Sequence, residues 1–435
     1  MSKDRLLAAL AEIWDVRFPG PENILKAPPF LRLQELCKSE YNAGSPAFSL
    51  SNALRALGAP FALPEKASRF SLPVDRAAER LDAALRSAKA EMRHLVPLDM
   101  ADDLPELRFG NSEVRRFTEP ELAEIFDAPR IARTMRGHQI DLTEFSGFQW
   151  LLIREAIDLK DEPEKRAMPW MYGSLDRDFG QIDPHKPRFP AAVEAALAFL
   201  MTAPWEEWVG MPEVDLFAFR VPWVHTVSDD LFVRIEAPPV SSTLSFTQDY
   251  YTHHDGSTEE YTRRLMLPID DQAILKLSDW QSARWLAFER ARCSVLFETP
   301  IEHFLVRAFA TEGIDSFLAH MTAIEAALGM SGDFRGQGAP SAPPRKSAGK
   351  KMQARIASLV GRAEAKDFDH LYNLRSAFLH GRKMQAISTA EQIKARRIAR
   401  LVVEALIDAA NRQTISDRSA FLDNRTLAGL SLLPP

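Results

Sequence analysis

The chain has 435 residues, 46% hydrophobic and 26% charged, the proportions of a globular protein that buries a sizeable core. No apolar run reaches the ~18 residues of a membrane-spanning helix, and Asp4 and Glu12 bracket an N-terminal segment typical of a surface helix, not of a signal peptide. The two cysteines, Cys37 and Cys293, exclude a disulfide framework and a cysteine-rich zinc site, and they favour the reducing cytoplasm. The length predicts two or three domains, with no membrane partner.

The net charge of −6 is unevenly distributed along the sequence. Residues 300–435 contain 19 Lys and Arg against 13 Asp and Glu, a balance of +6, so the first 299 residues carry −12. A basic C-terminal region on an acidic body favours an anionic partner for that region. Helices of mixed charge often carry such an excess without any ligand, and the sequence leaves both interpretations open.

Residues 1–95 are predicted to form a helical N-terminal region. One helix is expected at Ser49–Leu57, where Gly58 and a following proline end it. The strongest helical pattern in this region is Val74–His94, which has small and apolar residues on one face and Arg and Glu on the other.

Residues 96–299 change character, because short apolar or alternating runs bounded by Pro, Gly and Asp replace the helical pattern. We expect strands at Leu107–Phe117, Phe148–Arg154, Val214–Val221, Leu231–Ile235, Thr243–Tyr251 and Tyr261–Leu267. We expect helices at Glu119–Phe126, Ala191–Met201 and Ser278–Glu298, and a surface loop at Asp158–Pro190. Because strands and helices do not alternate regularly, the pattern predicts an α+β domain with a mostly antiparallel sheet, not a doubly wound parallel sheet.

Residues 300–412 are predicted to form an all-α bundle, interrupted by a mobile loop at 331–350 that is rich in Gly, Pro and Ser. A stripe of apolar residues from Ile314 to Leu328 marks one helix, and a capping-box pattern at Ser388 and Glu391 opens the last one. Residues 413–435 are expected to be a tail.

The most informative stretch is LYNLRSAFLHG at 371–381, which continues an amphipathic helix and stops at a glycine. Arg375 lies beside the apolar stripe of this helix, and His380 lies five residues later, in its last turn. An ideal helix separates residues with that spacing by roughly 140°, so the two side chains do not share one narrow face.

This stretch resembles the Arg-x4-His signature of the HEPN superfamily, in particular its ApeA-like branch. The resemblance extends over about residues 300–412, including Ile324–Gly329 on an earlier helix, and covers no motif in the first 300 residues. Many family members carry a polar amide, Asp or His directly after the arginine, whereas this chain has Ser376. The resemblance implies an all-α bundle and a dimer that cuts RNA without a metal or cofactor, often in bacterial defence against phage.

The residue types fit that chemistry. Arginine is permanently charged and grips phosphate through two parallel donors, and histidine exchanges protons near neutral pH. Arg375 would therefore hold the phosphate and His380 would act as acid and base, with support from Ser376 and from Glu325, which would orient Arg375. The basic residues expected to line an RNA path are Arg382, Lys383, Arg396, Arg397 and Arg400.

Other interpretations remain open. Arg375 could simply form a salt bridge with Glu325 or Asp369, and a histidine at a helix C-terminus is favoured by the helix dipole. The alternative function is therefore a non-catalytic HEPN module that binds RNA or dimerises, under regulation by the N-terminal body and a trigger that it senses. The His253–Asp255 stretch is a weak metal candidate, because no further ligand motif accompanies it.

Overall fold

The computed structural model describes residues 2–20, 23–41, 46–172, 178, 180–181, 187–333, 347–379 and 386–434. The chain is a mixed α+β protein with a small antiparallel sheet and a helical C-terminal region. It divides into two compact units, each made of three segments: Met1–Pro97, Arg116–Ile182 and Pro222–Leu244 form unit 1, and Leu98–Arg115, Asp183–Val221 and Ser245–Pro435 form unit 2.

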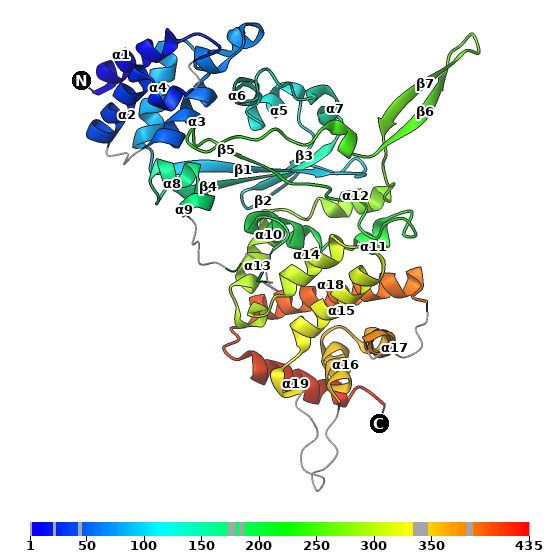
Figure 1. Cartoon of the computed structure of the whole chain (residues 1–435). Coiled ribbons are helices and arrows are strands. Elements are labelled where there is room, and N and C mark those ends of the chain that lie inside the picture. The colour runs from blue at the N-terminus through cyan, green and yellow to red at the C-terminus, as the bar shows by residue number, and fades with distance from the viewer. Residues whose placement is uncertain are drawn as a thin grey trace. The chain divides into compact units, whose positions relative to one another are not determined.

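Unit 1 begins with four helices, which are drawn in blue in Figure 1: α1 (Ser2–Trp14), α2 (Pro28–Tyr41), α3 (Ala47–Leu57) and α4 (Val74–Arg86). Their apolar faces meet in one core, to which Leu6, Phe30 and Leu54 contribute fully buried side chains. The predicted helix that Gly58 ends is confirmed, since Gly58 takes a φ of 81° and its N–H donates to the carbonyl groups of the last turn.

The sheet of unit 1 contains β4 (Gln149–Asp158), β1 (Lys89–Leu98) and β5 (His225–Ser228), in that spatial order. Strand β5 pairs antiparallel with β1, from Met92 opposite Ser228 to Leu95 opposite His225. The predicted helix Val74–His94 is therefore wrong beyond Arg86. Residues 89–98 are a strand because the apolar residues that follow position 94 are buried in the sheet, and this tertiary burial outweighs local helix propensity.

Short helices complete unit 1: α5 (Glu119–Ile125), α6 (Ala128–Thr134), α7 (Leu142–Ser146), α8 (Pro163–Ala167) and α9 (Pro169–Tyr172). An aromatic cluster joins α7 and the loop after α5 to the sheet, with Phe126, Phe145 and Trp150 in mutual contact. The expected surface loop at 158–190 thus contains helices α8 and α9. The expected strand at 231–235 is not formed, because this segment runs without a strand partner.

Unit 2 contains two antiparallel hairpins, β2–β3 (Leu107–Phe109 and Ser112–Arg115) and β6–β7 (Phe246–Thr252 and Thr258–Arg264). The β6–β7 hairpin projects from the rest of unit 2 in Figure 1. The strand predicted at 214–221 is absent apart from an isolated bridge between Asp99 and Arg220.

Four helices precede the C-terminal region of unit 2: α10 (Ala191–Leu200), α11 (Trp205–Trp208), α12 (Asp271–Leu277) and α13 (Ser282–Arg292). The predicted helix at 191–201 is confirmed. The predicted long helix 278–298 is wrong in its length, since α13 ends at Arg292 and a short 3-10 turn, Val295–Phe297, follows it.

The C-terminal region consists of α14 (Ile301–Phe309), α15 (Gly313–Leu328), α16 (Ala348–Leu359), α17 (Arg362–Leu379), α18 (Thr389–Arg412) and α19 (Arg418–Leu430). These helices share one core that contains Phe317, Ile324, Phe368, Leu371 and Leu406. The predicted capping box of the last long helix is confirmed, because the Ser388 hydroxyl accepts from Glu391 N–H and the Glu391 carboxylate accepts from Ser388 N–H.

Two predictions about this region are wrong. The expected tail 413–435 contains α19, which packs on α16 and buries Phe421 and Leu422, because its apolar face completes the core. The bounds of the loop expected at 331–350 are wrong at both ends, since Asp333 is buried and α16 begins at Ala348. Residues 334–346 lie outside the described part of the chain.

The contiguous domains predicted at 1–95, 96–299 and 300–412 differ from the two units, whose segments alternate along the chain. The physical reason is long-range pairing. Strand β5 pairs with β1, more than a hundred residues earlier, and the chain that follows it places Phe232 in the core of the N-terminal helices. Local periodicity carries no signal for such pairings.

Candidate functional site on helix α17

Arg375 lies on α17 and forms an ion pair with Glu325 of α15, at 2.9 Å between Nη2 and Oε2. The Arg375 side chain remains 22% exposed and that of Glu325 14% exposed, so the pair lies at the edge of the helical core. Of the partners considered from the sequence, the structure thus selects Glu325. Because the salt bridge uses one guanidinium nitrogen, it orients Arg375 while leaving further donors for a ligand.

Glu325 occupies a position that disfavours the charged form of its carboxyl group. Burial raises the pKa of Glu325 above its usual value, and the positive charge of Arg375 offsets only part of that shift. Its second oxygen, Oε1, is buried and accepts no hydrogen bond from any residue within the described ranges. The Glu325 carboxylate therefore has unused acceptor capacity beside the guanidinium.

Tyr372 lies one turn before Arg375 and completes the immediate surroundings of the ion pair. The carbon of the Arg375 guanidinium is 5.9 Å from the centre of the Tyr372 ring, a cation–π distance. Burial and then the Glu325 carboxylate raise the pKa of Tyr372, so its hydroxyl stays protonated and can donate. Tyr372 also packs closely on α16: a Cβ at Gly349 would meet its ring at 2.9 Å, which fixes the position of α17 against α16.

Of the other residues predicted for the site, Ser376 is half-buried on α17. His380, Arg382 and Lys383 lie outside the described residues. The structure therefore brings Arg375 and Glu325 together and leaves the predicted pairing of Arg375 with His380 as a prediction.

The prediction that Arg396 and Arg400 line an RNA path is wrong, because both side chains are buried. Arg396 donates from Nη2 to the carbonyl oxygens of Met201 (2.5 Å) and Ala203 (3.0 Å), and burial lowers its pKa to about 10. Its Nε lies 3.6 Å from Glu206, whose side chain is also fully buried. These contacts attach α18 to the segment around α11. The remaining donors, Nε and Nη1, have no hydrogen-bond partner within the described residues, but burial keeps them out of reach of a phosphate in solution.

Arg400 is held by three carboxylates. Its Nε and Nη2 each lie 2.8 Å from an oxygen, of Glu206 and Glu207 respectively, and Nη1 lies 3.1 Å from Glu404. Arg397, by contrast, is half exposed and has only longer ion pairs, at 3.6 Å to Glu207 and 3.9 Å to a glutamate of α17. Of these three arginines, Arg397 alone has a guanidinium that can reach a ligand in solution.

A cavity of about 550 Å³ lies on another face of α17 and was not anticipated from the sequence. Its walls come from the start of α15, from α17 and from the start of α18, with Phe317, Leu374 and Phe378 among the apolar residues. The polar groups at the cavity are His370, Asn373 and Gln392. The apolar stripe of α17 is visible in the sequence, but a cavity needs the spacing of three helices and has no sequence signal.

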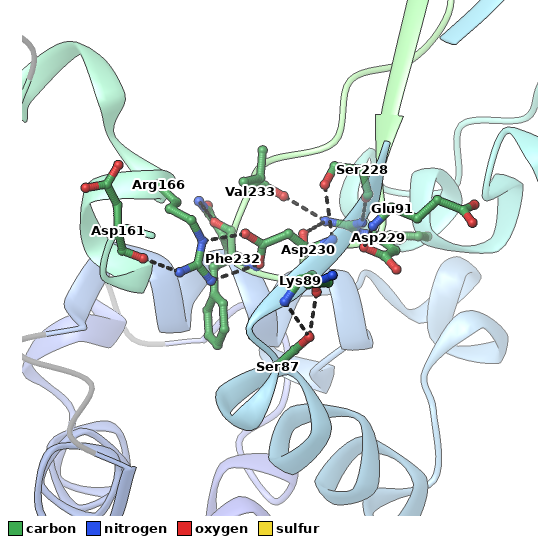
Figure 2. Close-up of polar contacts among 12 residues, drawn as sticks. Ser87, Lys89, Glu91, Asp161, Arg166, Ser228, Asp229, Asp230, Phe232 and Val233 are labelled. Carbon is green, nitrogen blue, oxygen red and sulfur yellow. Dashed lines mark hydrogen bonds and ion pairs between the residues drawn. The ribbon is translucent and has the colours of Figure 1, made fainter. Parts of the chain in front are cut away.

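A polar cluster in unit 1, shown in Figure 2, holds the chain around residues 228–233. Buried Arg130 donates to the backbone carbonyls of Ser228, Asp230 and Val233. Arg166 forms an ion pair with Asp230 at 2.7 Å, with its guanidinium over the ring of Phe232 (Figure 2). These bonds fix the chain that follows β5, and the Nε of Arg130 is buried without a hydrogen-bond partner within the described residues.

A second hydrogen-bonded chain crosses the sheet of unit 1. The buried His94 ring lies 2.8 Å from the Glu155 carboxylate through Nε2 and 2.9 Å from the Thr226 hydroxyl through Nδ1. A carboxylate, an imidazole and a hydroxyl in line resemble the arrangement that activates a nucleophile. The three residues come from three neighbouring strands, so the arrangement joins β4, β1 and β5.

Within the described ranges, no group of three or more His, Cys, Asp and Glu side chains is arranged to hold a metal ion, and His253 pairs with Glu259 across the β6–β7 hairpin. No helix in the same ranges is long and apolar enough to cross a membrane.

Comparison with models of known protein families, with curated proteins and with solved structures finds no match for this chain.

Proposed function

We propose that the C-terminal helical region is a HEPN-type ribonuclease domain that cuts RNA without a metal, as a homodimer in the cytoplasm of a bacterium. The observation that carries the proposal is Arg375: a partly exposed arginine late in a helix of a compact helical region, oriented by Glu325. The sequence places His380 five residues later, next to the end of α17. The basic balance of residues 300–435 fits an anionic substrate.

The proposed reaction is attack of the ribose 2′-hydroxyl on the adjacent phosphorus. The 2′-oxygen forms a bond to phosphorus, the bond from phosphorus to the 5′-oxygen breaks, and the products are a 2′,3′-cyclic phosphate and a 5′-hydroxyl. One His380 takes the proton of the 2′-hydroxyl, and His380 of a second copy gives a proton to the leaving oxygen. Arg375 holds the phosphate and stabilises the charge that develops on it. Each chain contributes a single His380, and the reaction uses one as the base and another as the acid, so the proposal requires two copies.

RNA cleavage in EDTA tests this function. The comparison includes the wild type, His380→Ala and Arg375→Ala, with Arg362→Ala as a control, since Arg362 is an exposed arginine at the start of the same helix. Loss of the acid–base group should lower the rate by about 10²–10⁴, and loss of the phosphate clamp by about 10²–10³. The control should cleave at the wild-type rate. Cleavage that persists in both site variants, or that requires a metal, would refute the proposal.

A non-catalytic module that binds RNA or dimerises is the second candidate, and one observation favours it. Arg375 already has a carboxylate partner, as a purely structural arginine would. RNA that is bound but not cut by the wild type, with Arg375→Ala weakening the binding, would establish this alternative. In both cases residues 1–299, which carry a balance of −12, would sense the trigger and regulate the C-terminal region, in a role such as defence against phage.

A further inference from the structure

We infer that the cavity on α17 is a subsite for a nucleobase of the RNA, which gives the proposed ribonuclease a base preference. The inference rests on the proposed function for its biological meaning. It can be tested without RNA cleavage, because the site would also bind single nucleotides.

The size and charge of the cavity favour an uncharged ring. About 550 Å³ lies within the range of ~300–1,000 Å³ that small-molecule sites occupy. None of the described residues that line it is Asp, Glu, Lys or Arg. A phosphate would be poorly accommodated there, whereas a base can enter and leave its phosphate outside the cavity.

The walls supply stacking surfaces. Phe317 of α15 and Phe378 of α17 both line the cavity, together with Leu374. Recognition of single-stranded RNA uses aromatic side chains of this kind, because every base has a flat π-face.

The polar groups supply the means to distinguish bases. Asn373 and Gln392 each present a primary amide, with one acceptor and two donors, and neither side chain forms a hydrogen bond within the described part of the chain. His370 is held by Glu391 at 2.8 Å through Nε2, so the Nδ1 of a neutral ring is an acceptor. Asn and Gln amides read base edges through such paired donors and acceptors.

The position of the cavity suits a nucleotide that flanks the scissile bond. Leu374 precedes Arg375 and Phe378 follows it by three residues, so cavity and arginine share one turn of α17. On α15, Phe317 and Glu325 are eight residues apart, roughly 12 Å along the helix. The cavity lies on another face of α17 than Arg375, so a strand whose phosphate meets Arg375 would pass around this turn of α17 to bring a nearby base to the cavity.

Calorimetric titration with AMP, GMP, CMP and UMP tests the subsite directly. The wild type should bind at least one of the four with a Kd in the millimolar range or tighter. Ala377→Trp, which places a large ring in the cavity, should abolish that binding, and Ala363→Trp, the same change at an exposed position of α17, should leave it intact. Asn373→Ala keeps the volume of the cavity nearly unchanged and should weaken the binding of the preferred nucleotide roughly tenfold. This variant replaces Ala377→Trp as the test if Ala377→Trp fails to fold.

Three results would overturn the subsite: no binding of any of the four nucleotides, binding that Ala377→Trp and Asn373→Ala leave unchanged, or binding only of an apolar dye that Ala377→Trp displaces. Cleavage of a mixed-sequence RNA separates this failure from failure of the proposed function. If the wild type cuts RNA and Asn373→Ala leaves the base preference at the cut sites unaltered, the nuclease proposal is supported and the subsite is refuted. If nucleotides bind as expected but RNA is not cut, the subsite is supported and the nuclease proposal is refuted.

Discussion

Replacing Arg400 by alanine should destabilise unit 2 strongly, whereas replacing Arg397, three residues earlier on the same helix, should not. Arg400 is 5% exposed and pairs with Glu206, whose side chain is completely buried. Without Arg400, Glu206 keeps only the 3.6 Å contact to Arg396, in which no hydrogen bond forms. Removing one partner of a buried ion pair costs about 3–5 kcal/mol, because the remaining charge stays buried.

Arg397→Ala is the matched control, since it removes the same side chain from the solvent-facing side of α18. Arg397 is half exposed and its ion pairs are 3.6 Å and 3.9 Å long, so its loss should cost about 0–1 kcal/mol. Each kcal/mol shifts the midpoint of a unit of 150–250 residues by ~2–4 °C, which predicts a loss of roughly 6–20 °C for Arg400→Ala and less than about 4 °C for Arg397→Ala.

Differential scanning calorimetry would measure both variants, and the transition that shifts identifies unit 2. Equal, small losses in the two variants would show that the carboxylate cluster around Arg400 contributes little to stability.

RNA affinity should respond the other way. Arg397→Ala should weaken RNA binding and reduce its salt dependence while the fold stays intact, because Arg397 alone of these arginines is exposed. Unchanged RNA binding in this variant would remove Arg397 from the RNA path.

Three further predictions follow from buried groups. Burial alone would raise the pKa of Asp333, but hydrogen bonds from its arginine and lysine partners outweigh burial and hold that pKa below its usual value. The charged carboxylate therefore stabilises the fold above pH ~3.8, and this stabilisation is lost as the pH falls below that value. Asp333→Asn should lower the free energy of unfolding, measured in urea, by about 3–5 kcal/mol at pH 7, and the difference from the wild type should shrink in acid. Gly429→Ala should destabilise the C-terminal region by about 1–3 kcal/mol or more, because the new Cβ would lie 1.7 Å from the Ala354 carbonyl oxygen. A thermal midpoint equal to that of the wild type would contradict the packing of α19 on α16. Burial raises the pKa of Cys37 to about 12, so a thiol reagent should titrate one thiol, the exposed Cys293, in the native protein and two after denaturation.

Local sequence patterns were sufficient for the long helices of the C-terminal region. The apolar stripe from Ile314 to Leu328 matches α15, and the capping box at Ser388 fixes where α18 begins. Within each pattern, successive residues lie only three or four positions apart along the chain, which is why periodicity and capping chemistry detect them. The same holds for the class of the protein, because short alternating runs between helices indicate an antiparallel sheet.

The same patterns failed where distant residues decide the outcome. Residues 89–94 are predicted to be the end of a helix, but they belong to strand β1, which pairs with β5. Residues 413–435 read as a tail until α16 offers a surface on which α19 buries Phe421 and Leu422. Propensity is a weak preference, and burial against a partner far along the chain outweighs it.

For the site, the sequence by itself determined which residue types could grip and cleave a phosphodiester, and it singled out Arg375 from the helical stripe beside it. Only the tertiary structure decided that Glu325 holds Arg375, that Arg396 and Arg400 are enclosed, and that a cavity opens on α17. The reason is that composition specifies charge but not exposure. Whether an arginine serves a ligand or the fold depends on carboxylates and carbonyl groups that lie, for Arg396 and Arg400, almost two hundred residues away in the chain.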